Sequence, residues 1–232
     1  MPGLNPPMDD LTRRTLTGLA KFQLFLALVI FLPAGSLRYW QGWLYWVTFA
    51  LLCLVLGLYF ARHDPALVAR RMEAGPTAEK EPRQKLILAC ASVALVALYI
   101  VSGFDHRFRW SSVPSWLVLV ADLLVILAAY GFYVTFRENS YAASTVTVET
   151  GQPVISSGPY ASVRHPMYTA AVLLYVATPV ALGSWWGLLP AAILVGAIVW
   201  RLMDEEAYLV RHLSGYVEYR HRVRARLFPG VW

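Results

Sequence analysis

Six long apolar segments, separated by shorter polar stretches, dominate this sequence and constrain its fold more than any motif does. They cover residues 16–34, 42–61, 86–103, 113–136, 167–183 and 185–202. A helix needs about 20 apolar residues to cross the hydrocarbon core of a bilayer. Because 58% of the residues are hydrophobic and only 15% are charged, we expect an all-α integral membrane protein.

The last two apolar segments are short for membrane-spanning helices, and only Gly183 and Ser184 separate them. This tight connection predicts a C-terminal helical hairpin that does not have to cross the membrane fully, so the number of spans stays between five and six. The first segment is interpreted as a membrane helix rather than a cleaved secretory signal, because no small-residue cleavage site follows it.

The basic residues predict an orientation in the membrane. If six spans begin with the N-terminus inside, every Lys and Arg except Arg38, Arg107 and Arg109 falls on the inner side. Cytoplasmic loops carry such an excess, so both termini are expected in the cytoplasm. The basic residues lie in loops without an exposed aromatic platform, which favours membrane lipids as partners and not nucleic acid.

Three polar regions are expected to have local structure. Residues 62–85 contain proline turns around a short basic helix, and residues 137–160 contain a stretch, 144–149, that alternates like a short strand. We interpret 137–160 as a cap over a pocket; an ordinary connecting loop is the alternative. The tail predicts an amphipathic interfacial helix that Pro229-Gly230 ends. Its apolar face would carry Tyr216, Tyr219, Val223 and Leu227.

Several signatures of soluble enzymes are missing from the sequence. It has no glycine-rich dinucleotide or phosphate loop and no Gly-x-Ser-x-Gly turn. No group of His, Cys and Asp has the spacing of metal ligands, so no metal site is expected. Cys53 and Cys90 lie inside apolar segments and predict neither a disulfide nor a ligand.

Two polar clusters border the hairpin. The first runs from Gly158 to Tyr168 and contains Arg-His-Pro, with Pro166 suited to the first position of a helix. The second contains Arg201 and Glu205, four residues apart and hence on one helix face, with Glu206 about 100° away. Each could be ordinary, as an aromatic belt or a salt bridge at the membrane edge. Because the hairpin would bring both together, we predict that they line one cavity.

The spaced combination of these clusters with the tail Gly215-Tyr216-Val217-Glu218-Tyr219 resembles the isoprenylcysteine carboxyl methyltransferase family, which is related to phospholipid methyltransferases. The resemblance covers residues 137–232. It implies a membrane enzyme that uses S-adenosylmethionine near the cytoplasmic surface and receives a lipophilic acceptor from the bilayer. Residues 1–136 would then form a four-helix membrane region, and 137–232 the cofactor-binding and catalytic region.

The resemblance also implies roles for individual residues. Arg201 corresponds to the arginine on the substrate side. The residues implied to contact the cofactor are Gln152, Pro153, Val154, Ile155, Tyr160, His165, Pro166, Met167, Tyr168 and Glu205. A carboxylate acceptor would need no base, whereas an amine or thiol acceptor would need Glu206 or His165 as one.

The acceptor and the class of function stay open on the sequence alone. The acceptor is expected to be a lipophilic small molecule or a lipidated molecule, most simply a carboxylate as in prenylcysteine esterification. A membrane reductase that uses NADPH and a non-enzymatic membrane protein are the alternatives. Asp122, the one acid inside an apolar segment, is expected to hydrogen-bond a neighbouring helix. No obligate protein partner is evident.

Overall fold

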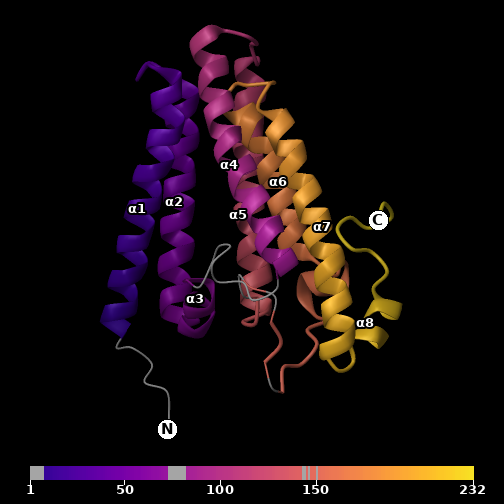
Figure 1. Ribbon diagram of the computed structural model, residues 1–232. Coiled ribbons are helices and arrows are strands. Elements are labelled where there is room, and N and C mark those ends of the chain that lie inside the picture. Colours follow the sequence, from indigo (N-terminus) through magenta and orange to yellow (C-terminus); the bar gives the residue numbers. More distant parts are fainter. Residues whose placement is uncertain (1–7, 73–81, 143–144, 146, 150) are drawn as a thin grey trace.

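Helices form nearly all of the regular structure in the computed structural model (Figure 1), which describes residues 8–72, 82–142, 145, 147–149 and 151–232. The long helices are α1 (Met8–Ala34), α2 (Trp40–His63), α4 (Pro82–Phe108), α5 (Ser115–Glu138), α6 (Pro166–Ala181) and α7 (Leu188–His212). The short ones are α3 (Pro65–Met72), the 3₁₀ turn η1 (Gly158–Ala161) and α8 (Tyr216–Arg222). No strand occurs among these residues, so the all-α class is confirmed.

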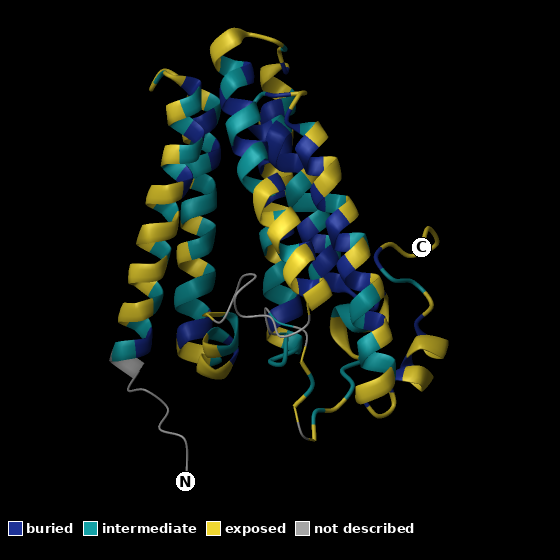
Figure 2. Cartoon of the chain, viewed as in Figure 1, coloured by how far each residue is buried: buried dark blue, intermediate teal, exposed yellow. Residues whose placement is uncertain are grey.

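The long helices pack in a ring, in the order α1, α2, α5, α6, α7, α4 and back to α1, and α6 also contacts α2 and α4. Buried apolar side chains such as Leu98, Val125 and Leu194 fill the middle of this arrangement. Large apolar side chains such as Leu32, Val55 and Leu123 are exposed on its outside, and the outer faces of the helices in Figure 2 are largely exposed. So much exposed apolar surface is unfavourable in water and suits lipid.

Among the described residues, four helices are long and apolar enough to span a bilayer: 10–34, α2, α4 and α5. α6 is apolar but has only 16 residues, as its short segment predicted. α7 has 25 residues, of which the last part is polar. α6 and α7 form the predicted hairpin, and Gly183 in their connection has a φ of +74°, which a residue without Cβ adopts most easily.

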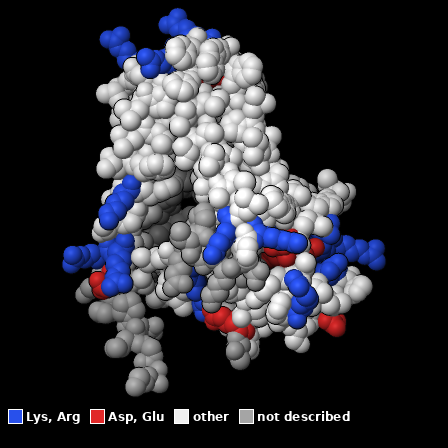
Figure 3. Space-filling view, in the orientation of Figure 1, with Lys and Arg blue, Asp and Glu red and all other residues white. Residues whose placement is uncertain are grey.

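α3, η1 and α8 lie at one end of the bundle, the end where α1 begins (Figure 1). Charged side chains gather at this end, while the band above it is mostly uncharged (Figure 3). The short helix predicted within 62–85 is therefore confirmed as α3. Thr145 and residues 147–149 are irregular, so the predicted strand is not present there; its residues 144 and 146 lie outside the described residues.

The C-terminal helix is shorter than the sequence predicted. α8 ends at Arg222, and the rest of the tail folds back against the loop before α6. Two backbone hydrogen bonds hold it there: Arg164 N donates to Ala225 O at 3.0 Å and His165 N to Arg226 O at 3.0 Å. Val223 and Leu227 are buried as predicted, but in an irregular segment, because backbone pairing with another loop replaces the helical pattern.

Asp122 on α5 accepts a hydrogen bond from Thr48 Oγ1 on α2 at 2.9 Å, which confirms the expected contact between helices. Its carboxylate is buried. If a buried carboxylate loses its hydrogen-bond donor, the free-energy cost of its desolvation is no longer compensated.

Thr48→Val should therefore lower the free energy of unfolding by about 1–3 kcal/mol. Thermal unfolding of the purified protein in detergent measures this change. Thr17→Val is a matched control, because Thr17 is exposed and bonds only the preceding turn of its own helix. Equal unfolding temperatures for the two variants would contradict a role for the contact between Thr48 and Asp122.

Candidate active site

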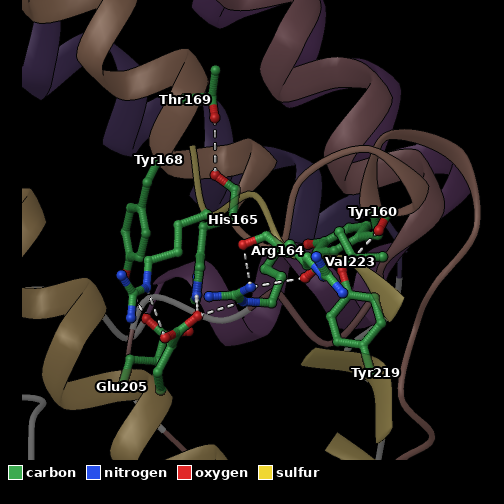
Figure 4. A network of polar contacts seen from close by, with 11 residues as sticks. Tyr160, Arg164, His165, Tyr168, Thr169, Glu205, Tyr219 and Val223 are labelled. Atoms are coloured by element: carbon green, nitrogen blue, oxygen red, sulfur yellow. Dashed lines mark hydrogen bonds and ion pairs between the residues drawn. The ribbon is translucent and has the colours of Figure 1, made fainter. Parts of the chain in front are cut away.

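The two polar clusters of the sequence meet at the open end of the hairpin, where the start of α6 lies beside the C-terminal half of α7. The Tyr168 hydroxyl, two residues into α6, donates a hydrogen bond to Glu205 and accepts one from Arg201 Nε at 3.0 Å. Figure 4 shows the Tyr168 and Glu205 side chains pointing toward each other. This chain of three groups places an anion beside a cation across one tyrosine, inside the protein.

The chain of groups lies in the wall of a cavity with about 840 Å³ of empty space, its open mouth included. Every residue predicted to contact a cofactor lines this cavity except Pro166, and Arg201 lines it too. The predicted residues in the wall are Gln152, Pro153, Val154, Ile155, Tyr160, His165, Met167, Tyr168 and Glu205. Pro166 occupies the first turn of α6, as predicted, and Glu206 lies outside the cavity.

The segment that we interpreted as a cap covers this cavity, and α3 holds it in position. Asn139, Tyr141, Ala142, Thr145 and Thr147 contribute to the lining together with residues 152–155. Arg70 on α3 forms two hydrogen bonds to the Glu149 carboxylate, at 2.6 and 3.2 Å. Arg71 Nη1 donates to Ala142 O at 3.0 Å. Neighbouring basic residues thus anchor both halves of the cap.

Gly158 turns the chain from the cap into η1. Its φ is +54°, and a Cβ at this position would lie 2.9 Å from the side chain of Glu138. Glu138 in turn accepts a hydrogen bond from the Ser157 hydroxyl. The turn brings Tyr160 into the wall, where Asn139 Nδ2 donates to its hydroxyl at 3.0 Å. Burial raises the pKa of Tyr160 to about 12, so this group stays neutral near pH 7.

Glu206 occupies a buried ion cluster directly behind the cavity. Arg164 Nε donates to its Oε1 at 2.6 Å, and Arg226 Nε donates to its Oε2 at 3.1 Å. His165 Nε2 lies 3.3 Å from Oε1. Burial alone would raise the pKa of Glu206, but the hydrogen bonds from His165 and Arg164 outweigh it and hold that pKa well below its usual range. With both oxygens engaged, Glu206 is placed to orient its neighbours rather than to accept a proton.

The C-terminal tail holds the Arg164 side chain in place through backbone carbonyl groups. Arg164 Nη1 donates to Val223 O at 2.8 Å and to Arg224 O at 2.7 Å. Figure 4 shows the bond from Arg164 to Val223. The Arg226 guanidinium lies 4.8 Å from the centre of the Trp232 ring. The tail is therefore a structural part of the site.

Two tyrosines of the C-terminal region form the far wall of the cavity. The Tyr219 hydroxyl donates a hydrogen bond to Tyr160 O at 2.8 Å. The Tyr216 hydroxyl is buried and has no hydrogen-bond partner among the described residues. A polar group of this kind in a cavity wall is available to a ligand. From the sequence these tyrosines were expected on the apolar face of an interfacial helix; their three-residue spacing after Gly215 places both on one face of α8, which here faces the cavity.

A comparison with protein families matches residues 116–215 to the phospholipid methyltransferase family. We refer to these matched residues as the phospholipid methyltransferase domain. The resemblance found in the sequence is confirmed at this level, since this family includes the isoprenylcysteine carboxyl methyltransferases. A search of curated proteins gave no match.

The phospholipid methyltransferase domain runs from α5 through the cap, α6 and α7 to the residue before α8. It therefore includes Tyr168, Arg201 and Glu205. α3 and the tail that holds Arg164 lie outside it. Together with four helices that can span a bilayer, the phospholipid methyltransferase domain indicates an integral membrane methyltransferase.

Glu206→Gln should destabilise the protein by about 3 kcal/mol, because it leaves buried guanidiniums without their counterion. The contribution of Glu206 is fully present above its ordinary pKa of 4.5 and is lost as the pH falls toward its lower folded-state pKa. Unfolding temperatures of the wild type and the variant should therefore differ at neutral pH and converge in acid.

Glu218→Gln serves as the control, since Glu218 is exposed on α8 and should change stability by less than about 0.5 kcal/mol. A difference between wild type and Glu206→Gln that stays constant from neutral pH down into acid would show that the charge of Glu206 does not stabilise the cluster.

Proposed function

We propose that this protein transfers a methyl group from S-adenosylmethionine to a lipophilic acceptor that carries a carboxylate. The observation that carries this proposal is that two unlike cavities share part of their lining. The polar cavity with Glu205 shares Met167, Tyr168 and Arg201 with a second, largely apolar cavity between α4, α6 and α7. A charged cofactor and an apolar acceptor could therefore meet at these three side chains.

The polar cavity has groups suited to S-adenosylmethionine. Glu205 supplies an anion in a wall that otherwise contains several aromatic faces, and both anions and aromatic faces attract a sulfonium or ammonium cation. The buried Tyr216 hydroxyl offers a hydrogen bond that the described residues do not use. Val154, Ile155 and Leu213 add apolar surface for a flat base. This set of groups fits a nucleoside with a cationic side chain.

The second cavity supports an acceptor with a hydrocarbon chain. It holds about 1010 Å³ of empty space, and its lining is mostly apolar, with Ile87, Leu88 and Ala91 from α4 and Leu194, Ala197 and Ile198 from α7. Because this cavity lies between largely apolar helices, an acceptor could reach it from the membrane. The apolar lining also excludes water from the reacting groups.

When bound, S-adenosylmethionine supplies a methyl group on a cationic sulfur; a carboxylate oxygen forms the new C–O bond as the C–S bond breaks, which yields a methyl ester and a neutral thioether. Arg201 would hold one carboxylate oxygen by a charge-assisted hydrogen bond and leave the other free. The Tyr168 hydroxyl fixes Arg201 and Glu205 relative to each other. Positioning of the two reactants accounts for most of the rate in such a displacement.

No proton leaves a carboxylate acceptor, so this reaction needs no general base. An amine or thiol acceptor would need one, and His165 is then the candidate, because it lines the cavity whereas Glu206 does not. The position of the cavity at the end with the basic loops (Figure 3) favours a cytoplasmic site with both termini in the cytoplasm.

Glu205→Gln should weaken binding of S-adenosylmethionine about tenfold, since it removes the anion from the cavity wall. Calorimetric titration of the purified protein in an uncharged detergent measures the affinity, and Glu218→Gln is the exposed control. Wild-type protein that binds NADPH and not S-adenosylmethionine would contradict the proposed cofactor.

Arg201→Ala should raise the acceptor KM or lower turnover by about tenfold or more, while S-adenosylmethionine still binds. Methyl transfer to a prenylated cysteine with a free carboxylate measures both constants. Arg211→Ala is the matched control, because Arg211 is exposed on the same helix and its Nε donates to Ala207 O, one turn earlier in that helix. Loss of cofactor affinity in Arg201→Ala would assign Arg201 to the cofactor instead.

A further inference from the structure

Residues 228–232 form an exposed apolar turn, which we call the tip. After α8 the chain runs toward the middle of the bundle, and its end lies beside α7 (Figure 1). Phe228, Val231 and Trp232 are all exposed, Val231 by 80%, and Figure 2 shows this end of the chain as exposed. Large apolar side chains that gather on one exposed turn are unfavourable in water and indicate an interaction surface.

The depth of the tip along the bundle follows from Leu227, the residue that precedes it. Leu227 is buried in one apolar cluster with Ile198 and Leu202 of α7, and its carbonyl accepts a hydrogen bond from Thr169 Oγ1 at 2.7 Å. Trp200 lies between Ile198 and Leu202 on α7 and is exposed. Tryptophan is enriched where lipid head groups meet the hydrocarbon core. The tip therefore lies at the level expected for the membrane interface.

The segment next to the tip is strongly basic. Residues 216–232 contain four arginines and only one acid, Glu218. Arg226 pairs with Glu206. The other three are exposed and form no ion pair with any described residue: Arg220, Arg222 and Arg224. Clusters of basic residues beside a membrane are attracted to anionic lipid head groups, so the charge of this surface complements an anionic bilayer.

The tip is attached to the candidate active site through Arg226. The Arg226 guanidinium lies 4.8 Å from the centre of the Trp232 ring, and its Nε donates to Glu206 Oε2 at 3.1 Å. The Arg226 carbonyl accepts a hydrogen bond from His165 N at 3.0 Å. An interaction that holds the tip in place therefore also holds the loop whose His165 lines the polar cavity.

We propose that α8 and the tail dock on the surface of an anionic bilayer. The tip enters the head-group layer, and Arg220, Arg222 and Arg224 bind anionic head groups. Docking orders the tail and, through Arg226, the loop before α6, so a bilayer without anionic lipid holds this part of the cavity wall less firmly. The inference needs a membrane protein but not the proposed methyl transfer, so the two can fail separately.

A purely internal role of the tail is the competing explanation. In that case the tail only packs against α6 and α7, its tip faces water, and the charge of the lipids has no effect on it. A second set of arginines separates the two explanations. Arg13, Arg62 and Arg83 lie on α1, α2 and α4, are exposed and form no ion pair with any described residue. Their replacement removes the same charge from other helices.

The test places a fluorescent probe on the tip of the full-length protein. Val231→Cys, in a chain in which Ala replaces the free Cys53 and Cys90, is labelled with a thiol-reactive fluorophore. The protein is placed in nanodiscs of phosphatidylcholine, with or without phosphatidylglycerol, and a lipid with a spin label near its head group serves as the quencher. Quenching should be about twofold stronger in the anionic discs.

The two sets of arginines should respond differently. The triple variant Arg220→Gln, Arg222→Gln and Arg224→Gln should lose the increase in quenching, because the charges that attract the head groups are gone. The control triple variant, Arg13→Gln, Arg62→Gln and Arg83→Gln, should keep it. Inorganic phosphate added to the neutral discs should not reproduce the increase, since the proposed partner is a lipid surface.

Hydrogen exchange of the unlabelled protein measures the coupling to the site. The His165 amide, which donates to the tail, should exchange about fivefold more slowly in anionic than in neutral discs. Three results would overturn docking: a probe that is not quenched in either disc, equal quenching in both discs, or an equal loss in the two triple variants. Exchange at His165 that ignores the lipid while the probe responds would overturn the coupling.

Discussion

The buried carboxylate of Glu206 is the contact on which the geometry of the site depends. It joins three segments that are far apart in the sequence: the loop before α6 through Arg164 and His165, the end of α7, and the tail through Arg226. Each partner is costly to bury alone, so the ions are stable only together. Because His165 lies in the cavity wall and in this cluster, folding of the tail is coupled to the shape of the cavity.

The neighbouring acids Glu205 and Glu206 show how one helix can serve structure and chemistry at once. Successive residues of a helix point about 100° apart, so Glu205 faces Tyr168 and the cavity, while Glu206 faces the loop and the tail. A shift of α7 by one residue would exchange these environments. The ion cluster therefore fixes the rotation of α7, and with it the direction of Arg201.

Much of this architecture follows from local sequence signals, and the rest from contacts between distant segments. Apolar length predicted the membrane helices, and the short connection at Gly183 predicted that Tyr168 and Glu205 would meet. The path of the tail after Arg222 was missed, because its backbone pairs with residues about 60 positions earlier and helical spacing contains no information on such pairing. Arg71 was counted only as a basic loop residue, since its place in the walls of two cavities depends on how several distant helices pack together.

The spacing of the cavity-lining side chains along α7 determines where the two proposed reactants could meet. Ile198 lines the apolar cavity, Arg201 lines both cavities, and Glu205 lines only the polar one. With a rise of 1.5 Å per residue, Arg201 and Glu205 are about 6 Å apart along the axis. An anion held at Arg201 and a cation held at Glu205 would thus lie on neighbouring turns of one helix face, with Tyr168 between them. The helical repeat would thus bring the proposed apolar acceptor and the proposed polar cofactor within reach of each other.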